Sequence, residues 1–263
     1  MIGWYFPLLG AAFALGIGII YFSAEKQQVP FRDFVQYNIA SVVGSIIGAR
    51  LFHVLFEERI HYYMAHPLEA IQPWLGGLSV IGGLFGALGL SLFIFRKRFS
   101  LWVTLFDCTA PAFFFGLALA RVGCFMNGCC FGRVTDVPWA VTYGSGKHAY
   151  ISQLRQGIIE PGAATTLPIH PTQLYESFSA LVIAIITLYY LRTPGRGKGK
   201  TALLGLALYM VARFIIEFYR GDRRGTWGVL SVPQVFCIAS LVVVGWVWWG
   251  FGRAVNASGQ TLD

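Results

Sequence analysis

Charged side chains are scarce in this sequence of 263 residues. Asp, Glu, Lys and Arg together make up 12% of it, whereas hydrophobic residues make up 56%. So few charges exclude an ordinary soluble globular domain, in which about a quarter of the residues are charged. The sequence also has no polar region large enough to form a separate soluble domain, so residues 1–263 are expected to form one membrane domain.

Seven apolar stretches are each long enough to cross a bilayer, which takes about 20 apolar residues in a helix. They cover roughly residues 4–23, 34–56, 75–96, 101–120, 173–191, 201–219 and 229–251. The sequence therefore predicts an all-α integral membrane protein with about seven transmembrane helices. The first stretch has no basic segment before it and is long enough to remain as a helix, so no cleavable signal peptide is expected.

The net charge of +8 has a topological explanation that requires no nucleic-acid partner. Basic residues gather in alternate short connections, and by the positive-inside rule these connections are cytoplasmic. The N-terminus is then outside and the C-terminus is cytoplasmic. The longest connection, about residues 121–171, is expected to form a small cap on the outer face. The basic residues concerned are Lys26, Arg32, Arg96, Lys97, Arg98, Arg192, Arg196, Lys198 and Lys200.

Several arginines fall on the outer side, where the positive-inside rule does not explain them. Arg121 is one of them, and it ends an apolar helix and begins a run of small residues, with Gly128 and Gly132 among them. An arginine at membrane depth usually faces a cavity, a partner or a ligand. Glycines let the backbone approach a ligand closely and point N–H groups at an anion. The run therefore predicts an anion site at the outer edge of the membrane.

Five cysteines give no convincing metal-binding pattern. Cys108 and Cys237 lie within predicted helices, where a cysteine is usually a small buried hydrophobic residue. Cys124, Cys129 and Cys130 would face the outer side, where a Cys124–Cys129 disulfide is one alternative. No second ligand pair with metal-site spacing follows, so neither a metal nor another cofactor is predicted.

Charged residues share one face of the sixth stretch. Arg213, Glu217 and Arg220 are spaced i, i+4 and i+7, which places them on one side of a helix. Glu217 can orient Arg213 and leave its outer donors free, and the planar guanidinium group suits phosphate. An internal salt bridge between helices is the alternative explanation.

The fifth stretch begins with a polar cluster. His170, Gln173, Tyr175 and Glu176 fall within seven residues, around a Pro171 that suits a helix start. This cluster is richer than a helix cap needs, although a purely structural cap remains an alternative.

Two further groups of ionisable residues lie in the second and fourth stretches. Arg50, His53 and Glu57 can share one face of the second stretch, where His53 is either a functional residue or a satisfied core histidine. Asp107 in the fourth stretch is expected to pair with Arg50 or Arg121, because an unpaired charge there would be costly.

The third stretch is rich in glycine between residues 76 and 86. Close packing of small-residue helix faces is one explanation, and a lining for a cavity is the other. Together with the outer arginines, these patterns predict an amphiphilic ligand with an anionic phosphate head group and acyl chains between the helices.

Four blocks of this sequence resemble the prolipoprotein diacylglyceryl transferase family. They are residues 76–83, 121–132, 170–176 and 213–220, and they occur in the family's order along nearly the whole chain. The segment Gly48–Phe52 and the pair Asp107 and Pro111 also fit the family.

The resemblance implies an enzyme of the bacterial inner membrane that needs no cofactor. Its substrates would be phosphatidylglycerol and preprolipoproteins whose signal peptide carries a lipobox cysteine. The diacylglyceryl group would pass to that cysteine thiol, releasing glycerol phosphate. By position in the motifs, Arg121 and Arg213 would hold the lipid phosphate. The residues expected to complete the lipid site are Asn127, Gly132, Glu217, Arg220 and Tyr5.

One departure from the family concerns the residue that would accept the proton of the substrate thiol. The family has a histidine to which a catalytic role is assigned at the position of Ile81. His53 and His170 are therefore the candidate bases, unless the arginines stabilise the thiolate without one. Residues expected to support the site are Arg50, Asp107, Gln173, Tyr175 and Glu176.

Ile81 also motivates an alternative function. A divergent or non-catalytic lipid-binding protein on the same fold would bind phosphatidylglycerol without turnover. A transporter or channel is less consistent with the sequence, because the ionisable residues gather at the outer face and form no path through the stretches.

Overall fold

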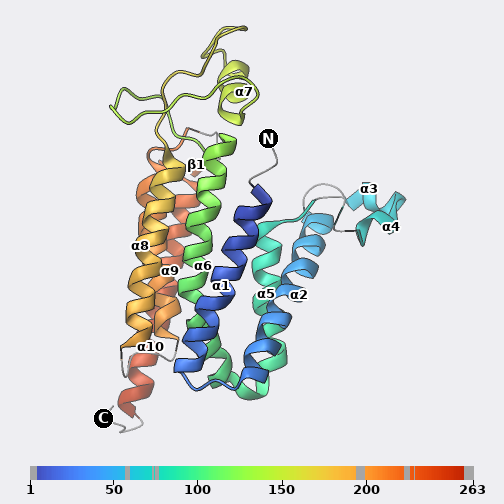
Figure 1. The fold of residues 1–263 in the computed structure, drawn as a ribbon, viewed down its shortest axis with the longest axis vertical. Coiled ribbons are helices and arrows are strands. Elements are labelled where there is room, and N and C mark those ends of the chain that lie inside the picture. Colours follow the sequence, from blue (N-terminus) through green and yellow to red (C-terminus); the bar gives the residue numbers. More distant parts are fainter. Residues whose placement is uncertain are drawn as a thin grey trace. The chain divides into compact units, whose positions relative to one another are not determined.

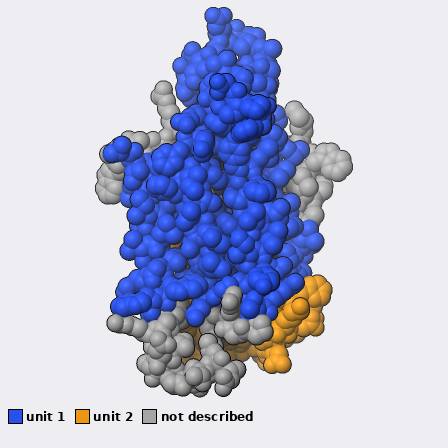
Figure 2. Space-filling view, turned by 90° about the vertical axis from the view of Figure 1, so that its left-hand side faces the viewer, with its two compact units in different colours: residues 1–20, 107–263 blue, residues 21–106 orange. Residues whose placement is uncertain are grey.

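Helices dominate the structure, a computed structural model that describes residues 5–56, 60–72, 74, 77–193, 199–221, 226–227 and 229–257. The chain divides into two compact units. Unit 1 comprises residues 1–20 and 107–263, and unit 2 comprises residues 21–106. Figure 2 shows the two units in different colours.

Each of the seven predicted stretches contains a helix, which confirms the all-helical prediction (Figure 1). The long helices are α1 (Tyr5–Lys26), α2 (Phe31–Phe56), α5 (Val80–Phe95), α6 (Phe99–Asn127), α8 (Thr172–Arg192), α9 (Lys200–Glu217) and α10 (Val232–Ala257). The shorter elements are α3 (Ile60–Ala65), α4 (Pro67–Ala70), the 3-10 helix η2 (Arg96–Arg98), α7 (His148–Arg155), and the antiparallel strands β1 (Thr226–Trp227) and β2 (Leu230–Ser231).

Four segments are long and apolar enough to cross a membrane among the residues that the structure describes. They are Phe31–Phe56, Ile81–Asn127, Thr172–Arg192 and Val232–Gly250. Large apolar side chains such as Phe178 and Trp246 point away from the protein interior. A surface of this kind is expected of a protein whose solvent is lipid.

Glycines bring α2 and α5 into close contact within unit 2. A Cβ atom on Gly86 would collide with the carbonyl oxygen of Gly44, and one on Gly82 would collide with the carbonyl oxygen of Gly48. Small residues allow two membrane helices to approach at backbone distance, where dispersion forces are strongest. The structure therefore favours helix packing over cavity lining for Gly82 and Gly86.

Arg50 ties the connection after α2 to that helix. Its Nε donates a hydrogen bond to the carbonyl oxygen of Ala70 at 2.9 Å, and Nη1 donates to that of Gly77 at 3.2 Å. Nη2 donates to the carbonyl oxygen of Glu69, and the guanidinium group lies 5.1 Å from the centre of the Tyr63 ring. These contacts give the buried Arg50 a structural role in unit 2.

His53 lies one turn further along the buried face of α2. Its ring packs against Gly77, where φ is +71° and a side chain would collide with the imidazole. The ring also makes an edge contact with Tyr63, with ring centres 6.1 Å apart. His53 and Arg50 thus share a face, as predicted, while Glu57 lies outside the described residues.

Asp107 caps a helix within unit 1. Its carboxylate oxygens accept hydrogen bonds from the backbone N–H groups of Gly199 at 2.7 Å and Ala202 at 2.9 Å, where α9 begins. The sequence predicted an ion pair with Arg50 or Arg121. That prediction was wrong because the N-terminus of a helix offers both unpaired donors and a favourable dipole to a carboxylate.

In unit 1, the part of α6 from Asp107 onward lies beside α8, α9 and α10 (Figure 1), and α9 contacts both α8 and α10. Phe114 of α6 packs with Ile183 and Ala184 of α8, and the Ser177 hydroxyl donates to the carbonyl oxygen of Ala118 at 2.8 Å. These contacts hold α6 and α8 together next to the ends that carry the polar residues.

The long connection between α6 and α8 has a small core of its own. Phe131, Tyr143, Ala149 and Ile169 are buried together, and Ile169 forms a backbone bridge with Val141. The sequence predicts a small outer cap in this connection. The structure shows that the connection packs around its own core, while its place on the outer face stays a prediction.

The close packing of α2 and α5 leads to a testable prediction. Gly86→Ala is expected to lower the thermal unfolding midpoint of the detergent-solubilised protein, because the new methyl group collides with the Gly44 carbonyl and forces α2 and α5 apart. Overpacking of this kind costs about 1–3 kcal/mol. Gly89→Ala is the matched control on the same helix, since a Cβ atom there meets nothing within 4 Å. Equal losses in the two variants would contradict the role of Gly86 in packing.

Candidate functional site

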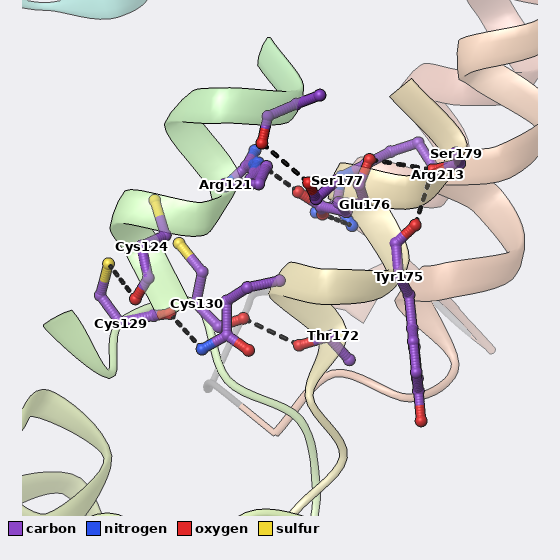
Figure 3. A network of polar contacts seen from close by, with 12 residues as sticks. Arg121, Cys124, Cys129, Cys130, Thr172, Tyr175, Glu176, Ser177, Ser179 and Arg213 are labelled. Atoms are coloured by element: carbon purple, nitrogen blue, oxygen red, sulfur yellow. Dashed lines mark hydrogen bonds and ion pairs between the residues drawn. The ribbon is translucent and has the colours of Figure 1, made fainter. Parts of the chain in front are cut away.

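Glu176 is the centre of a buried charge cluster in unit 1. Its side chain is 1% exposed and reaches three arginines from other parts of the unit. Its Oε2 lies 2.5 Å from Nε of Arg121 on α6 (Figure 3). Its Oε1 lies 3.2 Å from Nη1 of Arg213 on α9 and 3.5 Å from Nη1 of Arg220 just beyond α9. One carboxylate therefore holds three guanidinium groups together.

Glu217 supplies the second carboxylate of this cluster. Its Oε2 lies 2.7 Å from Nη2 of Arg213, and its Oε1 accepts a hydrogen bond from the Ser231 hydroxyl at 3.2 Å. The i, i+4 spacing on α9 predicted this pairing, and the structure confirms it. The salt bridge between helices, weighed as an alternative for these residues, is also present through Glu176.

Arginines outnumber carboxylates among the described residues of this cluster. Glu176 contacts Arg121, Arg213 and Arg220, and Glu217 contacts Arg213. Guanidinium groups gathered in this way are suited to bind an anion. Of the three arginine side chains, that of Arg121 is the most exposed at 20%, which makes it the most accessible donor.

The start of α8 is joined to the end of α6 by side-chain hydrogen bonds. The Thr172 hydroxyl donates to the carbonyl oxygen of Cys130 at 2.8 Å, and Nε2 of Gln173 donates to that of Cys129 at 2.7 Å (Figure 3). Gln173 is fully buried, and its Oε1 has no hydrogen-bond partner among the described residues. These bonds place Glu176, one turn further on α8, next to Arg121.

Gly132 lies where two chain segments meet. Its N–H donates to the carbonyl oxygen of His170 at 3.0 Å, and the next N–H, of Arg133, donates to that of Tyr219 at 2.9 Å. A Cβ atom at Gly132 would collide with His170 and with the Tyr219 backbone. Glycine is therefore required for the close approach that aligns the end of the 121–132 block with Arg220.

His170 belongs to a group of aromatic residues beside this junction. Its Nδ1 lies 3.1 Å from the Tyr175 hydroxyl, which also accepts a hydrogen bond from Nε1 of Trp139 at 2.7 Å. The His170 ring makes an edge contact with Tyr219 at 5.1 Å. These contacts fix the orientation of the imidazole.

The charge state of His170 follows from its surroundings. Burial and the positive charge of Arg133 lower the pKa of His170, and Asp136 opposes this in part. The imidazole is therefore neutral near neutral pH and has a lone pair with which to accept a proton.

Three cysteine side chains meet at the end of α6. The sulfur atoms of Cys124, Cys129 and Cys130 all lie within 4.8 Å of one another, and all three cysteines are free thiols. The alternative of a Cys124–Cys129 disulfide is thus not adopted. Hydrogen bonds from the Cys124 and Cys129 thiols, together with the positive charge of Arg220, hold the pKa of Cys130 well below its usual range.

The remaining predicted residues are distributed over the chain. Asn127 is exposed at the last position of α6, and the side chain of Tyr5 lies outside the described residues. Cys108 and Cys237 are buried within helices, as predicted. His53 belongs to unit 2, as does Ile81, which occupies the second position of α5 and is 56% exposed.

Two residues of the cluster were missed at the level of sequence. Tyr209 lies close to the Arg121 side chain. Its position four residues before Arg213 places it on the same face of α9, and that spacing could have revealed it. Ser231 lies in β2, and no sequence pattern connects it with Glu217.

Comparison with known proteins agrees with this geometry. Residues 1–250 match the prolipoprotein diacylglyceryl transferase family. A protein named phosphatidylglycerol–prolipoprotein diacylglyceryl transferase from Methylibium petroleiphilum is 34% identical, over 95% of this chain and 92% of its own. The proteins of that name from Bordetella bronchiseptica and Aliivibrio salmonicida are 32% and 34% identical, over 91% and 79% of this chain and 89% and 69% of theirs. The chain therefore belongs to the prolipoprotein diacylglyceryl transferase family.

Proposed function

We propose that this protein transfers the diacylglyceryl group of phosphatidylglycerol to the lipobox cysteine thiol of preprolipoproteins in the bacterial inner membrane, and releases glycerol phosphate. The observation that carries this proposal is the gathering of Arg121, Arg213 and Arg220 around the buried carboxylate of Glu176. Membership of the family and the names of the relatives support the same reaction.

Arg121 and Arg213 are the proposed ligands of the lipid phosphate. A guanidinium group can donate two parallel hydrogen bonds to phosphate, and Glu176 and Glu217 orient the two groups from behind. Arg220 adds positive charge to the same cluster. Residues proposed to shape the rest of the lipid site are Asn127, Gly132, Glu217 and Tyr5.

The proposed chemistry is a displacement at the glyceryl carbon. The substrate thiolate forms the new S–C bond while the C–O bond to phosphate breaks, and the electron pair of that bond passes to the phosphate oxygen. Negative charge therefore grows on the leaving group. Preorganised arginines in a site without bulk water stabilise such charge strongly, and this contributes the larger part of catalysis.

The thiol proton needs an acceptor. Ile81 stands at the position of the family's histidine and has no ionisable group, so another residue must take this role. We assign this role to His170, because its imidazole is neutral, is oriented by Tyr175 and belongs to the same unit as the arginines. His53 is the second candidate, and its buried contacts with Gly77 and Tyr63 are those of a packed core residue. Gln173 binds the Cys129 carbonyl group and Tyr175 orients His170, so both position the site. Asp107 and Arg50 stabilise the fold, at the start of α9 and in the connection after α2.

The proposed topology has seven spans, with the N-terminus and the 121–171 segment outside and the C-terminus in the cytoplasm. Alternate connections rich in Lys and Arg support it. We expect an epitope inserted after Gly146 of the full chain to bind antibody on intact spheroplasts. An epitope inserted after Lys97 serves as the control and should bind only after permeabilisation. The reverse pattern would contradict this orientation.

The role of the charge cluster can be tested by peptide lipidation. In detergent with phosphatidylglycerol and a lipobox peptide, the wild-type protein should add a diacylglyceryl mass to the peptide. Arg213→Gln and Arg121→Gln should each slow this reaction by about 10²–10³-fold, the usual effect of removing one donor to a developing oxyanion. Arg155→Gln, which changes an exposed arginine of α7, is the control and should retain the wild-type rate.

Two results would contradict these assignments. Binding of phosphatidylglycerol by the wild type with no lipidated peptide would instead favour a non-catalytic lipid-binding protein. Full activity in Arg213→Gln would contradict the phosphate-binding role of that arginine.

The role of His170 as proton acceptor can be tested by substitution. His170→Gln should slow turnover by about 10²–10⁴-fold, the usual contribution of a general base. The pKa of His170 lies below the ordinary histidine value, so wild-type activity should fall as the pH drops through that lowered value, because the imidazole gains a proton. The acidic fall should disappear in the variant.

Two other histidines make this test specific. His148→Gln is the exposed control on α7 and should leave the rate and the pH profile unchanged. A fall in turnover confined to His53→Gln, with loss of the acidic limb, would transfer the role from His170 to His53.

A further inference from the structure

We propose that Cys124, Cys129 and Cys130 bind one Zn²⁺ ion as a three-thiolate site, and that its open fourth position takes the thiol of the incoming peptide substrate. The second half of this proposal rests on the proposed function, whereas the metal site does not. The sequence alone predicted no metal here, because the cysteine spacing offers no second ligand pair.

The arrangement of the sulfur atoms carries the proposal. Zn–S bonds are about 2.3 Å long, so thiolates around a tetrahedral Zn²⁺ lie about 3.8 Å apart. The three sulfurs already lie within 4.8 Å of one another, and small side-chain rotations would close the site. Figure 3 shows the three side chains at the end of α6, next to the start of α8.

The surrounding backbone holds this arrangement in place. Cys130 has φ +59°, a conformation that residues other than glycine rarely adopt. Thr172 and Gln173 hold the carbonyl groups of Cys130 and Cys129, and the Cys129 N–H donates to the Cys124 carbonyl oxygen at 3.2 Å. A metal site requires ligands positioned in this way by surrounding hydrogen bonds.

The number of ligands identifies the kind of site. Structural zinc sites have four protein ligands, whereas sites with three protein ligands keep one position for water or substrate. Among the described residues, the cluster contains three thiols and no fourth metal ligand. The buried Oε1 of Gln173 has no hydrogen-bond partner among those residues, and its amide contacts Cys129. It is suited to accept a hydrogen bond from a metal-bound water or thiol.

Two arginines lie beside the thiols. A Zn²⁺ ion with three thiolates carries one negative charge, which neighbouring guanidinium groups stabilise. The positive charge of Arg220 acts on Cys130, and Arg121 precedes Cys124 by one turn of α6. A thiol bound to this metal would therefore lie next to the proposed phosphate ligands.

Coordination would supply the nucleophile that the reaction needs. A thiol bound to Zn²⁺ loses its proton, whereas a free thiol is only a few per cent thiolate at neutral pH. In this step the peptide thiol replaces the metal-bound water and its proton passes to the solvent or to a base. The bound thiolate then forms the S–C bond as the C–O bond to phosphate breaks, and zinc undergoes no redox change.

The metal site can be tested without any assay of activity. The full-length protein in detergent is treated with a chelator and a thiol-free reductant, supplied with Zn²⁺, freed of unbound metal and analysed for zinc content. We expect one zinc per chain for the wild type and none for the double variant Cys124→Ser/Cys129→Ser. The matched control is Cys108→Ser/Cys237→Ser, which also removes two thiols and should retain one zinc.

The open position is tested on the wild type, so that misfolding of a variant cannot obscure the result. With Co²⁺ in place of Zn²⁺, thiolate-to-metal charge-transfer absorption should appear. A lipobox peptide should then change the cobalt ligand-field bands, and the same peptide with serine in place of cysteine should not. Metal removal should also slow lipidation by about tenfold or more, the loss expected from a thiol that is no longer ionised by the metal.

The outcomes separate the metal site from the transferase reaction. A wild type that takes up no zinc, or a zinc content equal in the two double variants, overturns the site. Identical spectra with the cysteine and serine peptides, or full activity of the metal-free protein, overturn substrate binding to the metal. Zinc uptake and a peptide response without any lipidated product would support the metal site and contradict the proposed function instead.

Discussion

Glu176 is the residue on which the charged site depends, because its carboxylate is shared by three arginines. Without it, these buried arginines would lose the carboxylate that they share, although Glu217 would still contact Arg213. Removing one partner of a buried ion pair typically costs about 3–5 kcal/mol, since the remaining charge is left unpaired. The shared carboxylate keeps the three guanidinium groups together, and the proposed phosphate site depends on that arrangement.

The scaffold serves to bring that carboxylate and its partners to one place. Asp107 caps the start of α9, and Ser177 and Phe114 hold α8 against α6. Thr172 and Gln173 fasten the first turn of α8 to the end of α6, one turn before Glu176. The same two bonds place the carbonyl groups of the cysteine segment, so the positive cluster and the thiol cluster share one support.

Local patterns were the reliable part of the prediction. The seven apolar stretches contain helices, because apolar length needs no knowledge of partners. The Arg213–Glu217 pair follows from the pitch of a single helix. Asp107 was assigned the wrong partner, because the choice between an arginine and a helix N-terminus depends on which chain end lies nearby. Ser231 was missed for the same reason, since its partner Glu217 lies on another element. Tyr209 was missed although it shares a face of α9 with Arg213.

The sequence by itself determined the membrane character, the helices and the residue types available for anion binding, because these depend on composition and on periodicity within one element. Only the tertiary structure decided that Glu176, among the acidic residues of this chain, would bind three arginines. It also decided how the sulfur atoms of Cys124, Cys129 and Cys130 are arranged, because that depends on the turn after α6. The choice of Glu176 requires residues from separate helices to approach, and such contacts leave no local pattern in the sequence.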